Sequence, residues 1–552
     1  MKPAPFFVVA AIFGLLVHPV SATVYFVSGA GNDTNSGLTA NGAWRTVSRV
    51  NDQVLSPGDR VLFEGGTTFS GSIHVASPET GTASQPIVFS SYGQNRATIR
   101  PANNADGFSA RNSGGLIVSN LNFAGGGRTV NTGSGIEFYN NVAGTTLNCF
   151  RVDHVEVSGF GDVGVHFRGA GGTTRISDAR VTYANVHDIG QNGIKTSARG
   201  INVHSNIYIG FCTVSNVAGV TTTASHTGDG ILIAQSDNAL VEYCVAVGNC
   251  WNGNGAVGIW TFASTRVTIQ FCESFGNGTS GPDDGDGFDL DGGSTGCVMQ
   301  YNYSHDNAGA GYGVFQFSGA PPYANNIVRY NISQNDGRKN RYGAITLWND
   351  LNGGGINNVE IYNNTLFVSP AAGGTPSGIR FFGSSEFTNV NIRNNCIVTT
   401  HGLPLVESML ASMTGICFQG NDYWAGGRAF SIRCKKSTLY ASLDKWHVAG
   451  MEKIGGANVG YNLDPQLVNP GGGGTLGDAT LLPILLPRLT AYHTKPSSPL
   501  REAGLDLNAR FGLNTGAQDF YGNKVPNGLP DIGAYAGPSL QIQTQQSLPA
   551  GR

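Results

Sequence analysis

A glycine that opens a short apolar run returns about every thirty residues from residue 135 onward, and this repeat limits the fold more than any other feature of the chain. The glycines that mark it are Gly135, Gly164, Gly193, Gly230, Gly258, Gly287, Gly313, Gly343 and Gly378. A second column runs beside the first and consists of Cys212, Cys244, Cys272, Asn302, Asn331 and Asn363. Self-similarity at this period is typical of stacked supersecondary units, each of which is too small to bury its own apolar face.

Each repeat contains two or three short runs with strand alternation, such as 267–271 and 287–291, and turns rich in Gly, Asn, Asp and Ser separate these runs. Strands that stack in register from one repeat to the next form long parallel sheets that rise about 4.8 Å per coil. The Cys and Asn column then forms an inward ladder, in which free thiols pack as small apolar groups. The sequence therefore predicts an all-β chain folded as a parallel β-helix, or solenoid.

Both ends of the chain resemble those of known β-helix proteins. The opening segments YFVS (25–28), GND (31–33), WRT (44–46) and PGDRV (57–61) resemble the N-terminal cap of right-handed parallel β-helix proteins of the pectin-lyase-like superfamily. The closing segments, among them DPQLV (464–468) and DIGAY (531–535), are similar to the end of such proteins. The resemblance is specific for the fold and not for the reaction, because this scaffold hosts lyases, hydrolases, epimerases and noncatalytic proteins.

The expected organisation has four parts. A signal peptide is predicted over 1–22 from Lys2, an apolar run over 6–17 and small residues at 20–22. The apolar run is too short for a membrane span, which needs about 20 apolar residues. The N-terminal cap and first coils are expected over 23–130, regular coils over 131–435, and an irregular closing segment with one helix at 437–451 over 436–552. We therefore expect a secreted protein without a membrane span.

Composition limits the partners. The net charge of −3 argues against electrostatic binding to nucleic acid. The nine cysteines include no CxxC pair, so a zinc ribbon is not indicated. The expected partner is a polysaccharide, bound by a monomer, and the residues for it should lie on the outer face of the coils.

Alternation after each marker glycine predicts which side chains leave that face. The expected column is Glu137, His166, Lys195, Leu232, Trp260, Asp289, Gln316, Thr346 and Arg380, with Asp291 and Trp348 beside it. Exposed aromatic rings and acids on one sheet suit a sugar chain, because rings stack on sugars while carboxylates bind hydroxyls or act chemically. The predicted substrate-binding residues are Lys195, Trp260, Asp291, Gln316, Arg341, Trp348 and Arg380.

The densest group of acids is the segment DDGDGFDLD (283–291), with five carboxylates in nine residues. Such crowding indicates a bound cation or raised pKa values, and oxygen ligands in a flexible turn suit Ca²⁺. Asp229 occupies the position equivalent to Asp286 two coils earlier, roughly 10 Å away. This turn resembles the calcium site of family 9 polysaccharide lyases, in which a Lys removes the C5 proton of a uronate. The resemblance implies Ca²⁺ ligands at Asp229, Asp283, Asp284 and Asp286.

The leading hypothesis is a polysaccharide lyase that uses Ca²⁺ and cleaves a uronic-acid-containing glycan by β-elimination, with Asp286, Asp289 and Lys339 as catalytic residues. Lys339 is the Lys closest to the acids by coil count. A second hypothesis is a glycoside hydrolase in which Asp229 acts with Asp286 or Asp289 at the spacing of an inverting enzyme. A C5-epimerase, a purely structural Ca²⁺ site and a noncatalytic glycan-binding or surface β-helix are further alternatives.

Overall fold

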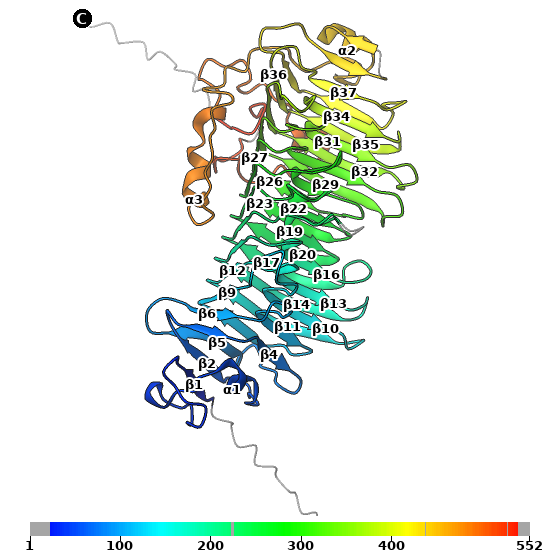
Figure 1. The fold of residues 1–552 in the computed structure, drawn as a ribbon. Helices are drawn as coiled ribbons and strands as arrows, with labels where there is room; N and C mark the ends of the chain where they lie inside the picture. The colour runs from blue at the N-terminus through cyan, green and yellow to red at the C-terminus, as the bar shows by residue number, and fades with distance from the viewer. Residues whose placement is uncertain (1–21, 222–225, 436–437, 527, 539–552) are drawn as a thin grey trace, which may run out of the picture.

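The computed structural model describes residues 22–221, 226–435, 438–526 and 528–538. In these residues three long sheets, here named A, B and C, run along an elongated solenoid, and each coil of the chain adds one strand to each sheet in that order (Figure 1). The predicted signal peptide lies outside the described residues except for Ala22. The boundaries proposed at 130 and 435 stay predictions.

Sheets A and B are parallel throughout. Sheet A consists of β1 (Val24–Val27), β2 (Arg60–Glu64), β5 (Ile87–Tyr92), β8 (Leu116–Ser119), β11 (Thr146–Asp153), β14 (Arg175–Thr182), β17 (His204–Gly210), β20 (Ser236–Glu242), β23 (Thr265–Gln270), β26 (Val298–Gln300), β29 (Tyr323–Arg329), β32 (Ile356–Tyr362), β35 (Phe387–Arg393) and β38 (Ile416–Gln419). Sheet B consists of β3 (Thr68–Ser70), β6 (Ala97–Arg100), β9 (Leu121–Ala124), β12 (Glu156–Ser158), β15 (Asn185–His187), β18 (Thr213–Ser215), β21 (Val245–Val247), β24 (Glu273–Phe275), β27 (Tyr303–His305), β30 (Ile332–Gln334), β33 (Thr365–Val368), β36 (Cys396–Thr399) and β39 (Asp422–Trp424).

Sheet C contains the strands that follow the marker glycines. It consists of β4 (Ile73–Ala76), β7 (Phe108–Arg111), β10 (Ile136–Asn140), β13 (Val163–Gly169), β16 (Asn192–Ser197), β19 (Asp229–Ala234), β22 (Val257–Phe262), β25 (Asp286–Leu290), β28 (Tyr312–Gln316), β31 (Gly343–Asn349), β34 (Ser377–Gly383), β37 (Val406–Ser408), β40 (Ile432–Cys434) and β41 (Thr438–Tyr440). The last strand, β41, pairs antiparallel with β40, and the other neighbours in the sheet are parallel.

One continuous apolar core fills the solenoid from the first coil to the last. Because side chains alternate along each strand, every second residue of a strand meets its equivalents on the coils above and below. Phe138 and Phe167, for example, stack inside with ring centres 5.1 Å apart. The predicted all-β parallel solenoid is confirmed.

A polar ladder runs through the interior beside this core. Cys244 N donates to Cys272 Sγ, Cys272 N donates to Asn302 Oδ1, and Asn302 N donates to Asn331 Oδ1. The ladder continues through Asn364, Asn395 and Asn421 to the carboxylate of Glu452. The predicted inward column is therefore confirmed as far as Asn331, and its cysteines are free thiols. On the next coil Asn364 continues the ladder, not Asn363, whose Nδ2 donates to the carbonyl oxygen of Asp531.

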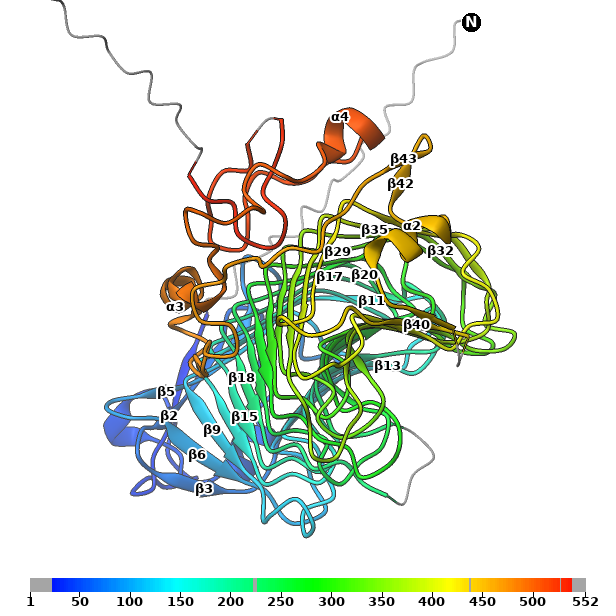
Figure 2. The same ribbon diagram turned by 90° about the horizontal axis from the view of Figure 1, so that it is seen from above.

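The C-terminal segment returns along the outside of the solenoid. It contains α2 (Leu443–Val448), β42 (Lys453–Ile454), β43 (Ala457–Asn458), α3 (Leu482–Leu485) and α4 (Leu507–Phe511), and a short helix, α1 (Val47–Asn51), lies near the N-terminus. From above, α3 and α4 lie on the side of sheets B and A, away from β13 and β40 of sheet C (Figure 2). The C-terminal helices thus do not cover the outer face of sheet C.

The helix predicted over 437–451 is shorter in the structure. Helix α2 begins after Ser442, whose side chain accepts a hydrogen bond from Lys445 N, and residues 438–440 before it form β41. The closing segment was predicted to contain one helix, but the short helices α3 and α4 follow α2 in the structure. Of the helices in the described ranges, none has the length and apolar character needed to cross a membrane.

Candidate functional site

Three aspartates leave the outer face of sheet C at strand β25. Phe288 and Leu290 point into the core, so Asp289 and Asp291 point outward. Asp286 is in register with Val257, which packs with Trp260 in an apolar cluster outside the core. Asp286, Asp289 and Asp291, here called the aspartate triad, therefore share one side of the sheet.

Aromatic side chains flank the triad on the neighbouring strands. In the column of Asp291, the strand register places Phe262 before it and Phe315, Trp348 and Phe382 after it. Trp260, which is in register with Asp289, stacks on Phe262 with ring centres 5.5 Å apart. The result is an acidic strand set into an aromatic surface.

A glycine makes room for the central carboxylate. Gly313 is in register with Asp289, and a Cβ atom on Gly313 would lie 2.6 Å from Asp289 Oδ1. Because atoms cannot approach so closely, the Asp289 side chain occupies the space that a side chain at 313 would need.

The triad is buried and only partly hydrogen-bonded. Asp286 and Asp289 are nearly inaccessible to solvent, whereas Asp291 is half-buried. Asp286 Oδ1 accepts a hydrogen bond from Ala310 N. One oxygen of each carboxylate, and the indole Nε1 of Trp260, have no hydrogen-bond partner among the described residues. Unsatisfied buried groups are costly, so their clustering indicates a site kept for function.

Burial also raises the pKa values of these acids. Desolvation, followed by repulsion from neighbouring aspartates, holds the pKa of Asp286 and of Asp289 well above the usual value. Burial raises the pKa of Asp291 to about 8. At neutral pH the triad is therefore expected to keep protons that ordinary aspartates lose.

Asp229 lies two strands before Asp286 in the same column, as predicted. The register of Ile231 with Ile259 places Asp229 opposite Val257, and Val257 is in register with Asp286. Its oxygens accept hydrogen bonds from Asn192 Nδ2 and Val257 N, and burial raises its pKa to about 7. Both oxygens are thus already engaged.

The two remaining predicted calcium ligands lie in the turn before β25. Asp283 is exposed and accepts a hydrogen bond from Asn254 Nδ2, and Asp284 accepts one from the Tyr342 hydroxyl at 3.2 Å. In the part of the chain that the structure describes, no group of three or more His, Cys, Asp or Glu side chains is placed to hold one metal ion. The four predicted ligands do not converge there, and calcium binding stays a prediction.

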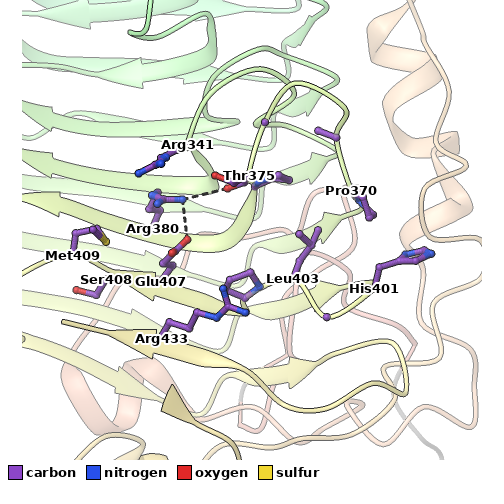
Figure 3. A pocket seen from close by; sticks show the side chains of 15 residues that line it. Arg341, Pro370, Thr375, Arg380, His401, Leu403, Glu407, Ser408, Met409 and Arg433 are labelled. Carbon is purple, nitrogen blue, oxygen red and sulfur yellow. Dashed lines mark hydrogen bonds and ion pairs between the residues drawn. The ribbon is translucent and has the colours of Figure 1, made fainter. Parts of the chain in front are cut away.

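The predicted basic residues gather at a different point of the same face. Two adjoining cavities of about 890 and 540 Å³ share Arg341, Thr375, Arg380 and Met409 in their linings. The remaining charged residues of the larger cavity are Asp283 and Lys339. Those of the smaller cavity, which Figure 3 shows, are Glu407 and Arg433. We call the two cavities together the arginine groove.

The structure corrects the predicted outward column at Gln316 and in the exposure of several other members, which are buried: His166, Leu232, Trp260, Asp289, Thr346 and Arg380. Gln316 does not belong to it, because Gly313 is in register with both Asp289 and Thr346. The Gln316 side chain is buried and donates to the carbonyl oxygens of Pro321 and Gly353. Trp260 does belong to the column, but it is buried rather than exposed.

The other predicted site residues divide between the two regions. Lys195 lies three strands before Asp289, and its Nζ donates to Asn192 Oδ1. Lys339 Nζ donates to the carbonyl oxygen of Thr279, above the acidic turn. Trp348 is half-buried beside the triad. Arg341 and Arg380 lie in the arginine groove.

Sequence reasoning missed Glu407 and Arg433. Glu407 is in register with Arg380, and Arg433 with Glu407, so both continue the outward column. Carrying the alternation past the last marker glycine would have found them. The coil after Gly378 lacks such a glycine, because the strand opens at Leu405–Val406.

Comparison with known proteins shows a shared fold. Residues 174–366 match the model of a family described as the right handed beta helix region. The chain is a right-handed parallel β-helix, and the resemblance of its coils to such proteins is confirmed.

A lacto-N-biosidase of Bifidobacterium longum subsp. longum is 24% identical over 461 residues, which cover 63% of this chain and 27% of that protein. The solved GH136 lacto-N-biosidase of Eubacterium ramulus has 19% identity and a TM-score of 0.45 over 70% of this chain and 65% of its own. Pectate lyase Pel9A has 16% identity and a TM-score of 0.41 over 94% and 97%. This chain thus spans about a quarter of the first relative and less than two thirds of the second. At such identities the likeness concerns the fold alone.

Proposed function

We propose that this protein is a glycan-cleaving enzyme, and that it acts as a glycoside hydrolase through the aspartate triad. The observation that carries the proposal is the set of three outward carboxylates in and directly after β25. Asp286 and Asp289 are buried and Asp291 is half-buried, one oxygen of each has no hydrogen-bond partner among the described residues, and a column of aromatic rings lies beside them. The sequence relation to a lacto-N-biosidase supports the same class of reaction.

The geometry of Asp289 and Asp291 suits a pair of catalytic acids. Residues two apart along an extended chain have Cα atoms about 6.7 Å apart and side chains on one face. Two carboxyls placed in this way leave room between them for a substrate and a water, as in inverting enzymes, whose carboxyls lie roughly 6.5–9.5 Å apart. Burial, followed by the charge of Asp291, holds the pKa of Asp289 well above its usual value, so Asp289 is the member of the pair expected to keep its proton.

We assign the proton donor to Asp289 and the base to Asp291. Asp289 is the more buried of the two, and its carboxyl leans into the space left by Gly313. Its proton would pass to the glycosidic oxygen as the bond to the anomeric carbon breaks. Asp291, which is more exposed and loses its own proton near pH 8, would in its ionised form take a proton from the water that attacks the opposite side of that carbon.

A lyase that acts by β-elimination on a uronate remains the second candidate. It is favoured by Lys339 and Arg341, which line a cavity together with Asp283 next to the acidic turn. In that reaction Lys339 would accept the C5 proton. Calcium, if bound at the turn, would neutralise the uronate carboxylate.

One experiment separates these functions. Purified protein is incubated with a panel of neutral and acidic polysaccharides, and reducing ends and the absorbance of new unsaturated bonds are measured together, with and without EDTA. The hydrolase predicts reducing ends without unsaturated products, no loss with EDTA, and loss of activity in Asp289→Asn. Unsaturated products that disappear with EDTA and in Asp283→Asn would establish the lyase instead. Retention of glycans without turnover would leave a binding protein.

A further inference from the structure

The arginine groove lies on the same face as the triad but farther along the solenoid. Arg380, Glu407 and Arg433 stand in consecutive strands of the column that contains Asp289. Arg380 is three strands from Asp289, which corresponds to about 14 Å at 4.8 Å per strand. The groove is therefore a separate site, within reach of one extended ligand.

Cationic side chains outnumber acids in the groove. Lys339, Arg341, Arg380 and Arg433 line it, against Asp283 and Glu407. Glu407 pairs with Arg380 at 2.9 Å. Arg341 and Arg433 are exposed and have no acidic partner within the described ranges. The walls thus carry a positive charge that the protein itself does not neutralise.

The central guanidinium is held in place with donors to spare. Arg380 is almost completely buried, and its Nη1 contacts Glu407 Oε2 and donates to the carbonyl oxygen of Thr375 (Figure 3). Its Nε and Nη2 make no hydrogen bond in the described residues. Burial, and among its charged neighbours Arg341, lower the pKa of Arg380. A bound anion would relieve this repulsion.

We propose that the arginine groove binds the carboxylate or sulfate group of an acidic sugar residue, in a subsite remote from the cleaved bond. The planar fork of Arg matches the two oxygens of such a group, and Arg341 and Arg433 supply further donors from either side. This inference rests on the proposed function in one respect: it takes the anion to belong to the glycan that the triad cleaves. It makes the substrate an acidic glycan.

Binding is measured by calorimetry with the full chain carrying Asp289→Asn, so that no turnover interferes. The probes are an oligogalacturonide, the same oligosaccharide with its carboxyls reduced to alcohols, and a sulfated oligosaccharide of similar length. We expect the reduced probe to bind at least tenfold more weakly than the oligogalacturonide or the sulfated probe, whichever the groove prefers. Adding Arg433→Gln or Arg341→Gln should weaken the preferred acidic probe about tenfold and leave the neutral one unchanged.

Arg428→Gln provides the matched control, since Arg428 is an exposed arginine on a nearby turn outside the groove. Equal binding of the acidic and reduced probes, or equal effects of Arg433→Gln and Arg428→Gln, would overturn the inference. Selective binding of an acidic probe by a protein that never cleaves it would instead defeat the proposed function and leave the groove assigned. Cleavage of neutral glycans only would do the reverse.

Discussion

This solenoid has two sets of buried polar groups, the ladder inside the coils and the aspartate triad outside sheet C, and the two sets differ in one respect. Inside the coils, each Asn of the ladder is hydrogen-bonded above and below: Asn331 Oδ1 accepts from Asn302, and Asn331 Nδ2 donates to Asn364 Oδ1 and Met299 O. Outside sheet C, Asp286 and Asp289 of the triad are equally inaccessible, yet one oxygen of each carboxylate in the triad has no hydrogen-bond partner among the described residues. The ladder serves the fold, because every group in it is satisfied.

The triad, in contrast, costs the fold free energy. Buried carboxylates without partners destabilise a protein unless they hold protons or a ligand supplies the missing contacts. The end of the ladder is hydrogen-bonded in the same way as its middle. Glu452, which closes the ladder, accepts hydrogen bonds from Gly420 N, Asn421 Nδ2 and the Tyr423 hydroxyl. Changes in the ladder should thus affect stability, and changes in the triad should affect activity.

The largest expected effect is that of Asp289→Asn on cleavage. Loss of the proton donor should lower kcat about 10³-fold, within the range of general acid catalysis, while the melting temperature stays the same or rises because a buried repulsion is removed. Steady-state kinetics and thermal unfolding of the same preparation test both halves. Asp444→Asn, an exposed acid on α2, is the control. A stability loss in Asp289→Asn would assign the triad to the fold.

Gly313→Ala should disturb the triad without removing a carboxyl. The new methyl would push the Asp289 side chain away, and a shift of about 1 Å in a catalytic group costs on the order of 10²-fold in rate. Gly171→Ala is the matched control, because a Cβ atom there has no neighbour within 4 Å. Similar kinetics for the two variants would show that the position of Asp289 is unimportant.

Asn331→Ala should break the ladder and spare the chemistry. The change leaves buried donors and acceptors of Asn302, Asn364 and Met299 without partners, which should lower the free energy of unfolding by about 2 kcal/mol. Denaturant unfolding measures this loss, with Asn508→Ala on the exposed side of α4 for comparison. Activity per folded molecule should not change. A specific loss of activity would contradict the assignment of the ladder to stability and of the triad to catalysis.

The sequence repeat was enough to predict most of the positions that stack on one another. The distance between stacked strands is constant, and apolar residues determine which side of each strand faces the core, so the equivalence of Asp229 with Asp286 and of Trp260 with Asp289 could be predicted. The prediction failed at Gly313, where Gly311 is the true equivalent of Gly287. Two glycines stand two apart on this short coil, and a pattern of small residues cannot distinguish between them.

Burial of the site could not be predicted from the repeat. Turns that connect sheet B to sheet C fold over the outer face and make contacts between coils, as Lys339 does with Thr279 and Tyr342 with Asp284. Such contacts depend on turn conformations that have no periodic signature. Alternation therefore predicted the direction of Trp260 and Asp289 correctly and their exposure wrongly.

The pH dependence of stability tests the difference between the ladder and the triad without any substrate. An Asp whose pKa is raised on folding stabilises the native state fully below its unfolded pKa of about 3.9, and this contribution is lost as the pH rises through the folded value, about 8 for Asp291. The melting temperature should therefore fall between pH 4 and 8, and Asp291→Asn should make the fall shallower. Glu452, with a pKa raised by burial to about 7, contributes to both proteins alike, so the difference between the two curves isolates the triad. Parallel curves would mean that folding does not raise the pKa of Asp291, and the predicted contrast with the ladder would then be wrong for this residue.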